Sequence, residues 1–219
     1  MAESASSDFW LNSGGEFFFA GGFGHTIEGD LPASDRWHQA YARSSSVDTD
    51  GGSHPQNLFR LVTRRTFRDV AQDLTFTIRR YNSSGSPNRN QSNGVLLFQH
   101  YQDGDNLYYA GVRVDGAAVV KKKLAGSYYT LGLAPVYLGA YDRAQTPNLI
   151  PEGRPINLHT DTRTNSDQSV SVSLSVDGSA VLEVHDAGIG GAPIAEAGFA
   201  GIRTDFMDVD FESYRAEGQ

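Results

Sequence analysis

The 219-residue chain contains no cysteine. This absence excludes a disulfide framework, thiolate metal sites and cysteine nucleophiles. The chain also lacks an apolar run of the roughly 18 residues that a membrane-spanning helix needs, so we expect no membrane contact. Helical periodicity is scarce as well, and its best instance is a weak one from Thr66 to Gln72. We therefore expect very little helix.

Positive charge is in short supply. The chain has 18 lysines and arginines against 26 aspartates and glutamates, which gives a formal net charge of -8. A nucleic-acid-binding surface needs a basic patch or stripe to meet phosphates, so this balance argues against nucleic acid as a partner. The N-terminal residues MAESASSDF lack an apolar signal core. They suggest a start Met placed before a mature chain, so we expect a secreted or periplasmic monomer.

Glycine and aromatic residues are abundant, with 24 Gly, 12 Phe and 10 Tyr, a composition that favours short strands and tight turns. Apolar and polar residues alternate strictly over 74–78 and 170–176, which predicts half-buried antiparallel strands. About twelve to fourteen such runs are bounded by turn residues. We predict one all-β domain over residues 1–219, a two-sheet antiparallel β-sandwich of the concanavalin-like jelly-roll type.

Two long polar segments interrupt the predicted strands, one at 82–93 and the other at 140–154. Loops of this length in a compact domain are usually functional rims or lids. We expect these two segments to lie beside a ligand site.

The segment 106–130 combines a turn signal with concentrated positive charge. Asp115-Gly116 separates two extended runs, which predicts a two-residue hairpin turn in which both residues have positive φ. A second Asp-Gly pair at 177–178 predicts another such hairpin. The first hairpin carries Tyr109, Arg113 and a lysine run at 121–123. On an acidic chain, this charge predicts a surface that faces an anionic or polyhydroxylated ligand.

Three stretches of the chain follow a known pattern. The segment Val95–Asp115, the earlier RLVTRR and the closing GFAGIRTDFMDVDFESYR resemble concanavalin A-like jelly-roll modules of carbohydrate-active proteins. The chain is remotely similar to alginate-lyase-type polysaccharide lyases and to laminin-G-like glycan-binding domains. This resemblance covers most of the chain at the level of the fold and implies a carbohydrate ligand.

Lyases of the alginate type carry three strand motifs, R-(S/T)-E-L-R, Q-(I/V)-H and Y-x-K-A-G-x-Y-x-Q. The segment 60–64 keeps both arginines of the first motif, Gln99 keeps the glutamine of the second, and residues 110–111 keep the Ala-Gly core of the third. Where the motifs have glutamate, histidine, lysine and the catalytic tyrosine, this chain has Val62, Tyr101, Tyr109 and Arg113. The spacing is kept while the chemistry is rearranged, so the family mechanism does not carry over unchanged.

Cleavage of a uronate polymer by β-elimination requires groups that neutralise the carboxylate, remove the C5 proton and protonate the glycosidic oxygen. Arginine and glutamine can do the first, and tyrosine or histidine the others. Period two places Arg60 with Arg64, Gln99 with Tyr101, and Tyr109 with Arg113 on shared strand faces. On this hypothesis the catalytic residues are Tyr101, Tyr109 and His100, no cofactor is required, and the substrate-binding residues are Arg60, Arg64, Gln99, Arg113, Lys121 and Lys123.

Two other functions stay open. A non-catalytic glycan-binding module would use the same aromatic and cationic face for an anionic polysaccharide or oligosaccharide. A laminarinase-type retaining hydrolase ranks last, because it needs two carboxylates about 5 to 5.5 Å apart and its E-x-D-x-x-E motif is absent. Purely structural interpretations also stand: Arg60 and Arg64 as exposed ion-pair partners, and Lys121 to Lys123 as a solvated edge that blocks strand addition.

The closing segment DFMDVDFES places several acids on one strand face. The resemblance implies a structural calcium between an early strand and the last one. Oxygen ligands suit calcium, so Glu16 and Asp210 are the candidate pair. The alternative is that these acids are exposed on an edge strand.

Overall fold

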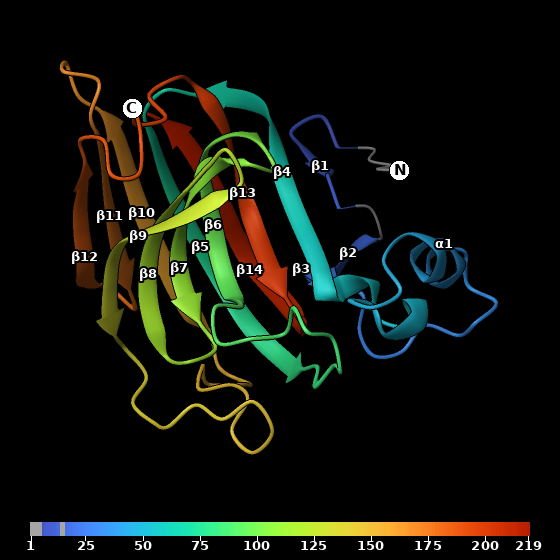
Figure 1. Ribbon diagram of the computed structural model, residues 1–219. Coiled ribbons are helices and arrows are strands. Elements are labelled where there is room, and N and C mark those ends of the chain that lie inside the picture. The colour runs from blue at the N-terminus through green and yellow to red at the C-terminus, as the bar shows by residue number, and fades with distance from the viewer. Residues whose placement is uncertain (1–5, 14–15) are drawn as a thin grey trace.

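The computed structural model describes residues 6–13 and 16–219. Within these residues, fourteen β-strands form two antiparallel seven-stranded sheets that pack face to face as a sandwich (Figure 1). The predicted all-β sandwich is therefore confirmed. No helix in the described part of the chain is long and apolar enough to cross a membrane.

The first sheet carries strands from both ends and the middle of the chain. Its order is β1 (Phe9–Leu11), β4 (Leu58–Phe67), β13 (Gly198–Asp205), β6 (Gly94–Asp103), β7 (Asn106–Arg113), β8 (Ala117–Leu124) and β9 (Ser127–Pro135). The second sheet has the order β12 (Ser179–Asp186), β11 (Val170–Val176), β10 (Ile156–Thr164), β5 (Val70–Tyr81), β14 (Met207–Gly218), β3 (Phe23–Thr26) and β2 (Phe17–Ala20).

The main hydrophobic core lies between the two sheets. Strand β11 alternates buried and half-buried residues along its whole length, as its serine-alternated sequence predicts. On β5, Leu74, Phe76 and Ile78 are almost completely buried. A second apolar cluster, which includes Val62, Phe98 and Tyr109, lies on the opposite face of the first sheet. That face therefore has a packed floor of its own.

Helix is as scarce as expected, but it lies elsewhere. The segment 66–72 is not helical: β4 ends at Phe67 and β5 begins at Val70. The helix α1 (Arg36–Ser44) lies outside both sheets (Figure 1), followed by the short 3-10 turns η1 (Asp50–Gly52) and η2 (Pro55–Asn57). Asp35 caps α1, because its carboxylate accepts a hydrogen bond from the Trp37 amide at 2.7 Å. Only Trp37 and Tyr41 of α1 are buried, so its apolar stripe is very short.

The two predicted hairpins exist, with different turns. Asp177 and Gly178 have φ angles of 49° and 77°, which confirms the two-residue turn between β11 and β12. Between β7 and β8, only Gly116 has a positive φ, of 81°. The amide of Gly116 donates to the Arg113 carbonyl at 2.9 Å, and three residues separate the two strands. The prediction of a two-residue turn is wrong here, because Gly116 alone adopts the left-handed conformation.

The two long polar segments are loops, as predicted. Residues 82–93 connect β5 to β6, and residues 140–154 lie between β9 and β10. Arg89 links them: its Nε donates to the Ser84 carbonyl at 2.5 Å and its Nη1 to the Arg143 carbonyl at 3.0 Å. Because Arg89 is buried, it fixes the first loop against the second.

Candidate functional site

A hollow of about 530 Å³ lies on the face of the first sheet that points away from the second sheet. We call it the first-sheet hollow. Its floor comes from apolar residues of three strands, Leu58, Leu96 and Val119. The 82–93 loop contributes one wall of amide and hydroxyl groups, as its polar sequence predicts. These wall residues are Asn88, Asn90, Ser92 and Asn93.

Three cations line the first-sheet hollow, from three different strands. Arg60 comes from β4, Lys121 from β8 and Arg203 from β13. Strand register places Arg60 directly opposite Arg203. Like charges directly opposite each other repel, so this pair costs free energy unless an anion lies between or beside them.

Arg203 has its own counter-ion. Its Nε lies 2.9 Å from a carboxylate oxygen of Asp205, and its Nη1 donates to the Tyr109 hydroxyl at 3.2 Å. Burial acts against the charge, but Asp205 outweighs it and raises the pKa of the Arg203 guanidinium. Arg203 therefore remains cationic in the floor of the first-sheet hollow.

Arg60 and Lys121 have no such partner. Among the described residues, none forms an ion pair or a hydrogen bond with the Arg60 guanidinium, and Lys121 has only the Ser92 hydroxyl at 3.4 Å. The pKa of Lys121 is lowered, first by burial and then by the charges of Arg113 and Arg203. The carboxylate of Asp48, also at the wall, is engaged by Asn88 at 2.9 Å. The lining therefore carries three cationic side chains against two carboxylates, Asp48 and Asp205, an excess of one positive charge.

Two tyrosine rings lie among these cations. Tyr109 and Tyr128 stack with ring centroids 6.1 Å apart and an interplanar angle of 28°. Tyr109 is 5% exposed and Tyr128 is 54% exposed. Burial raises the pKa of Tyr109 to about 12. Burial opposes ionisation of Tyr128 as well, but the charges of Arg203 and Lys123 outweigh it and lower the pKa of this phenol.

Of the residues that the sequence singled out for the site, the first-sheet hollow brings together Arg60, Tyr109 and Lys121. Lys123 lies at its margin, where Nζ is 5.1 Å from the centre of the Tyr128 ring and 3.0 Å from an Asp105 oxygen. Arg113 lies outside the lining, bound to Asp115 at 2.5 Å and to the Gln91 carbonyl at 3.2 Å. Arg113 therefore supports the 82–93 loop.

The predicted shared face of Gln99 and Tyr101 is wrong. His100 has a positive φ of 46°, and the pairing of β6 shifts register after Gln99. This bulge breaks the alternation. Gln99 points between the sheets, where its Nε2 is 3.4 Å from the Thr160 hydroxyl. Tyr101 lies on the outer face, against Phe98 at 5.2 Å.

His100 does not reach the first-sheet hollow either. It is 1% exposed, its Nδ1 lies 2.6 Å from the Ile194 carbonyl and its Nε2 lies 2.7 Å from the Arg68 carbonyl. The Tyr101 hydroxyl accepts a hydrogen bond from the Asn12 side-chain amide at 2.7 Å, and Tyr101 does not line the first-sheet hollow. The proposed catalytic set is therefore dispersed over three environments.

Two further predictions about cations are corrected. Arg64 shares the outer face with Arg60 but is exposed, and its Nε donates to the Ser6 carbonyl at 2.9 Å. The lysine run is not an edge, because β8 lies between β7 and β9. Lys122 points inward and is completely buried. Alternation alone separates Lys122 from Lys121 and Lys123.

Sequence reasoning missed Arg203, Asp205 and Tyr128. Arg203 and Asp205 alternate with the inward Ile202 and Thr204, and this pattern does mark one strand face. No local signal places β13 between β4 and β6, so no pattern could join Arg203 to Arg60. Tyr128 lies in the hairpin segment that carries the lysines, opposite Lys123.

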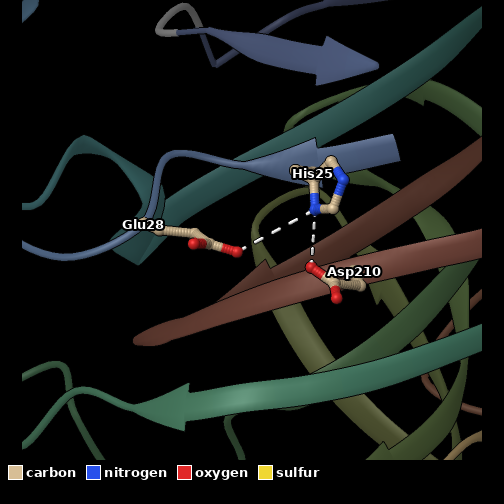
Figure 2. A group of neighbouring side chains, drawn as sticks. All are labelled: His25, Glu28 and Asp210. Atoms are coloured by element: carbon tan, nitrogen blue, oxygen red, sulfur yellow. Dashed lines mark hydrogen bonds and ion pairs between the residues drawn. The ribbon is translucent and has the colours of Figure 1, made fainter. Parts of the chain in front are cut away.

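The two acids of the expected calcium pair contact different groups. The Glu16 carboxylate contacts Arg36 at 3.3 Å. Asp210 instead contacts His25 at 2.7 Å (Figure 2) and Arg79 at 3.4 Å. The groups beside Asp210 are an imidazole, a guanidinium and the Glu28 carboxylate, whereas calcium prefers oxygen ligands alone. Calcium binding by Glu16 and Asp210 stays a prediction.

Comparisons with known proteins agree with the fold. No family model and no curated protein sequence matches the chain. The carbohydrate binding module CBM66 from Bacillus subtilis superposes with a TM-score of 0.60 at 12% identity, over 98% of both chains. The Emp46p carbohydrate recognition domain superposes with a TM-score of 0.51 at 10% identity, over 98% of this chain and 92% of that one. The GH43 protein BlXynB from Bacillus licheniformis superposes with a TM-score of 0.51 at 12% identity, over 97% of this chain but only 37% of that one. The chain therefore shares its β-sandwich fold with carbohydrate-binding domains.

Proposed function

We propose that this protein is a carbohydrate-binding domain whose first-sheet hollow takes acidic sugar residues of a polysaccharide or oligosaccharide. One observation carries the proposal: Arg60 and Lys121, both without a counter-ion among the described residues, lie in one hollow with the exposed ring of Tyr128. A sugar carboxylate or sulfate would offset the charges of Arg60 and Lys121 and would relieve the repulsion between Arg60 and Arg203, which lie directly opposite each other. The fold shared with carbohydrate-binding domains supports a glycan as ligand.

The two tyrosines and the loop wall suit a sugar ring. An exposed aromatic face stacks against the apolar face of a pyranose, and Tyr128 offers such a face. The amide and hydroxyl groups of Asn88, Asn90 and Ser92 offer donors and acceptors to sugar hydroxyls. A hollow of about 530 Å³ is within the usual range of ligand pockets. A polysaccharide ligand is consistent with a secreted or periplasmic protein.

The test compares acidic with neutral glycans. Affinity electrophoresis and calorimetry with alginate, glucuronan, hyaluronan and pectate should give binding, and dextran and mannan should give much weaker binding. Arg60→Ala and Lys121→Ala should each weaken binding by about tenfold or more, because each removes a charge-assisted contact.

Arg64→Ala is the matched control, because Arg64 lies on the same strand and face as Arg60 but outside the first-sheet hollow. Its affinity should stay at the wild-type value. Equal binding of neutral and acidic glycans would contradict an acidic ligand, and equal losses for Arg60→Ala and Arg64→Ala would contradict this location.

β-Elimination of a uronate polymer is the second candidate, and the lowered pKa of Tyr128 is the observation that favours it. A phenol with a lowered pKa beside arginines can act as a base toward a sugar proton. The same acidic glycans should then release unsaturated uronides, followed by their ultraviolet absorbance. Tyr128→Phe should abolish this release while much of the binding remains. No absorbance rise on any of them, together with retained binding, would leave binding as the function.

A further inference from the structure

Three possible metal ligands meet on the second sheet, on strands that do not contribute to the first-sheet hollow. His25 lies on β3, Asp210 on β14, and Glu28 follows β3 by two residues. Strand register places His25 directly opposite Asp210. One ligand atom from each of the three side chains lies within 4.8 Å of the other two. Figure 2 shows how the three side chains point toward one another.

The second nitrogen of the His25 ring has a fixed role. Nε2 lies 3.0 Å from the Ala20 carbonyl oxygen, which can only accept a hydrogen bond, so Nε2 carries a proton. In the neutral ring, the lone pair is then on Nδ1. Nδ1 lies 2.7 Å from an Asp210 carboxylate oxygen. Two lone pairs at this distance require a cation between or beside them, either a proton or a metal ion.

The surroundings match those of metal-binding histidines. Such histidines usually donate their other ring N–H to a main-chain carbonyl or a carboxylate, which fixes the ring and its tautomer. Ala20 plays this part for His25. Arg79 lies 3.4 Å from the second oxygen of Asp210, which leaves the first oxygen directed at His25.

We propose that His25, Glu28 and Asp210 bind a divalent transition-metal ion such as Zn²⁺. An imidazole nitrogen with two carboxylates suits zinc, whereas calcium prefers oxygen ligands alone. Two ligand atoms about 2.1 Å from a tetrahedral zinc ion lie about 3.4 Å apart. His25 Nδ1 and the Asp210 oxygen are 2.7 Å apart, so zinc between them needs them to separate by about 0.7 Å. The Glu28 oxygen is 3.9 Å from His25 Nδ1, so it needs to move inward by only about 0.5 Å, and its 57% exposed side chain is free to do so.

Bound zinc would connect β3 and the residues after it to the last strand. The proposal is independent of the glycan proposal, because the two sites share no residue. The test uses the full chain, stripped with EDTA and returned to a buffer without phosphate. Zn²⁺ at saturation should raise the Tm by about 5 °C or more, and Ca²⁺ should leave it unchanged.

Variants then locate the ion. His25→Ala should abolish the zinc-dependent rise in Tm, and the visible spectrum of added Co²⁺ should lose its ligand-field bands. Glu28→Gln changes a half-exposed side chain, so it should fold normally and weaken zinc binding by about tenfold or more. His159→Ala is the matched control, because His159 also pairs with an acid, Asp73 at 2.7 Å, but no third ligand lies beside this pair among the described residues.

Three results would overturn the proposal. The first is a Tm that zinc does not change. The second is a rise in Tm with calcium that equals the rise with zinc. The third is the same zinc response in His25→Ala, Glu28→Gln and His159→Ala, which would place the ion elsewhere.

Discussion

The ammonium group of Lys122 lies 2.7 Å from a carboxylate oxygen of Asp186, and both side chains are completely buried. Tyr108 donates a hydrogen bond to the same carboxylate at 2.6 Å. Lys122 also donates to the Gly191 carbonyl at 2.9 Å. Since β8 belongs to the first sheet and β12 to the second, this pair connects the two layers of the sandwich.

Removing either partner of this pair should destabilise the fold strongly. Lys122→Met leaves the Asp186 carboxylate buried without its cation, and Asp186→Asn leaves the ammonium group without its anion. Each change should lower the free energy of unfolding by about 3 to 5 kcal/mol in urea titrations. The exposed pair of Arg154 and Asp177, 3.3 Å apart, is the control, and Arg154→Met should cost less than about 1 kcal/mol. Equal costs for the two pairs would contradict the role of burial.

The same carboxylate should make stability depend on acid pH. Burial acts to raise the pKa of Asp186, but hydrogen bonds from Lys122, from Tyr108 and from the Gly188 and Ile189 amides lower it below the usual 3.8. A lowered folded-state pKa stabilises the native protein above the usual value. This contribution is lost as the pH falls below 3.8 toward the folded-state pKa. Asp186→Asn should flatten this part of the stability profile, and a profile identical to the wild type below pH 3.8 would contradict the shift.

Gly198 should not tolerate a side chain. A Cβ there would lie 2.4 Å from the carbonyl carbon of His100, in main-chain atoms of the bulge that cannot turn away. Gly198→Ala should therefore lower the free energy of unfolding by about 1 to 3 kcal/mol, measured by chemical denaturation. A Cβ on Gly104 would meet no atom within 4 Å, so Gly104→Ala should be nearly neutral. If both substitutions are neutral, the bulge is able to relax.

Tyr128 should titrate before an ordinary tyrosine. Its pKa is lowered, although burial opposes this, because Arg203 and Lys123 lie nearby. Ultraviolet phenolate absorbance should show a step below about pH 10 that Tyr128→Phe removes. Tyr109→Phe should instead reduce the step near pH 12 by one tyrosine, because burial raises the pKa of Tyr109 to about 12, as it does for Tyr41 and Tyr137. Above the Tyr128 pKa, the phenolate would repel an acidic glycan, so affinity should fall as the pH rises. An early step that persists in Tyr128→Phe would assign it to another tyrosine.

Local pattern is strong evidence for strands but not for their irregularities. The alternating serines of β11 predict that strand, because strict alternation of apolar and polar residues indicates a strand with one buried face and does not fit the 3.6-residue period of a helix. The bulge at His100 has no local signal, since no glycine marks the positive φ. Gln99 and His100 therefore look like site residues in the sequence and lie away from the site in the structure.

The sequence by itself determined the all-β class, the hairpin turn at 177–178, the polar loops and the alternation that separates Lys122 from Lys121 and Lys123. Each of these depends on contacts between residues that are close in the chain. Only the tertiary structure decided that Arg60, Lys121 and Arg203 line one hollow, because strand order brings residues far apart in sequence to neighbouring positions. It also decided that Lys122 is buried, because the partner that compensates its charge, Asp186, comes from the other sheet.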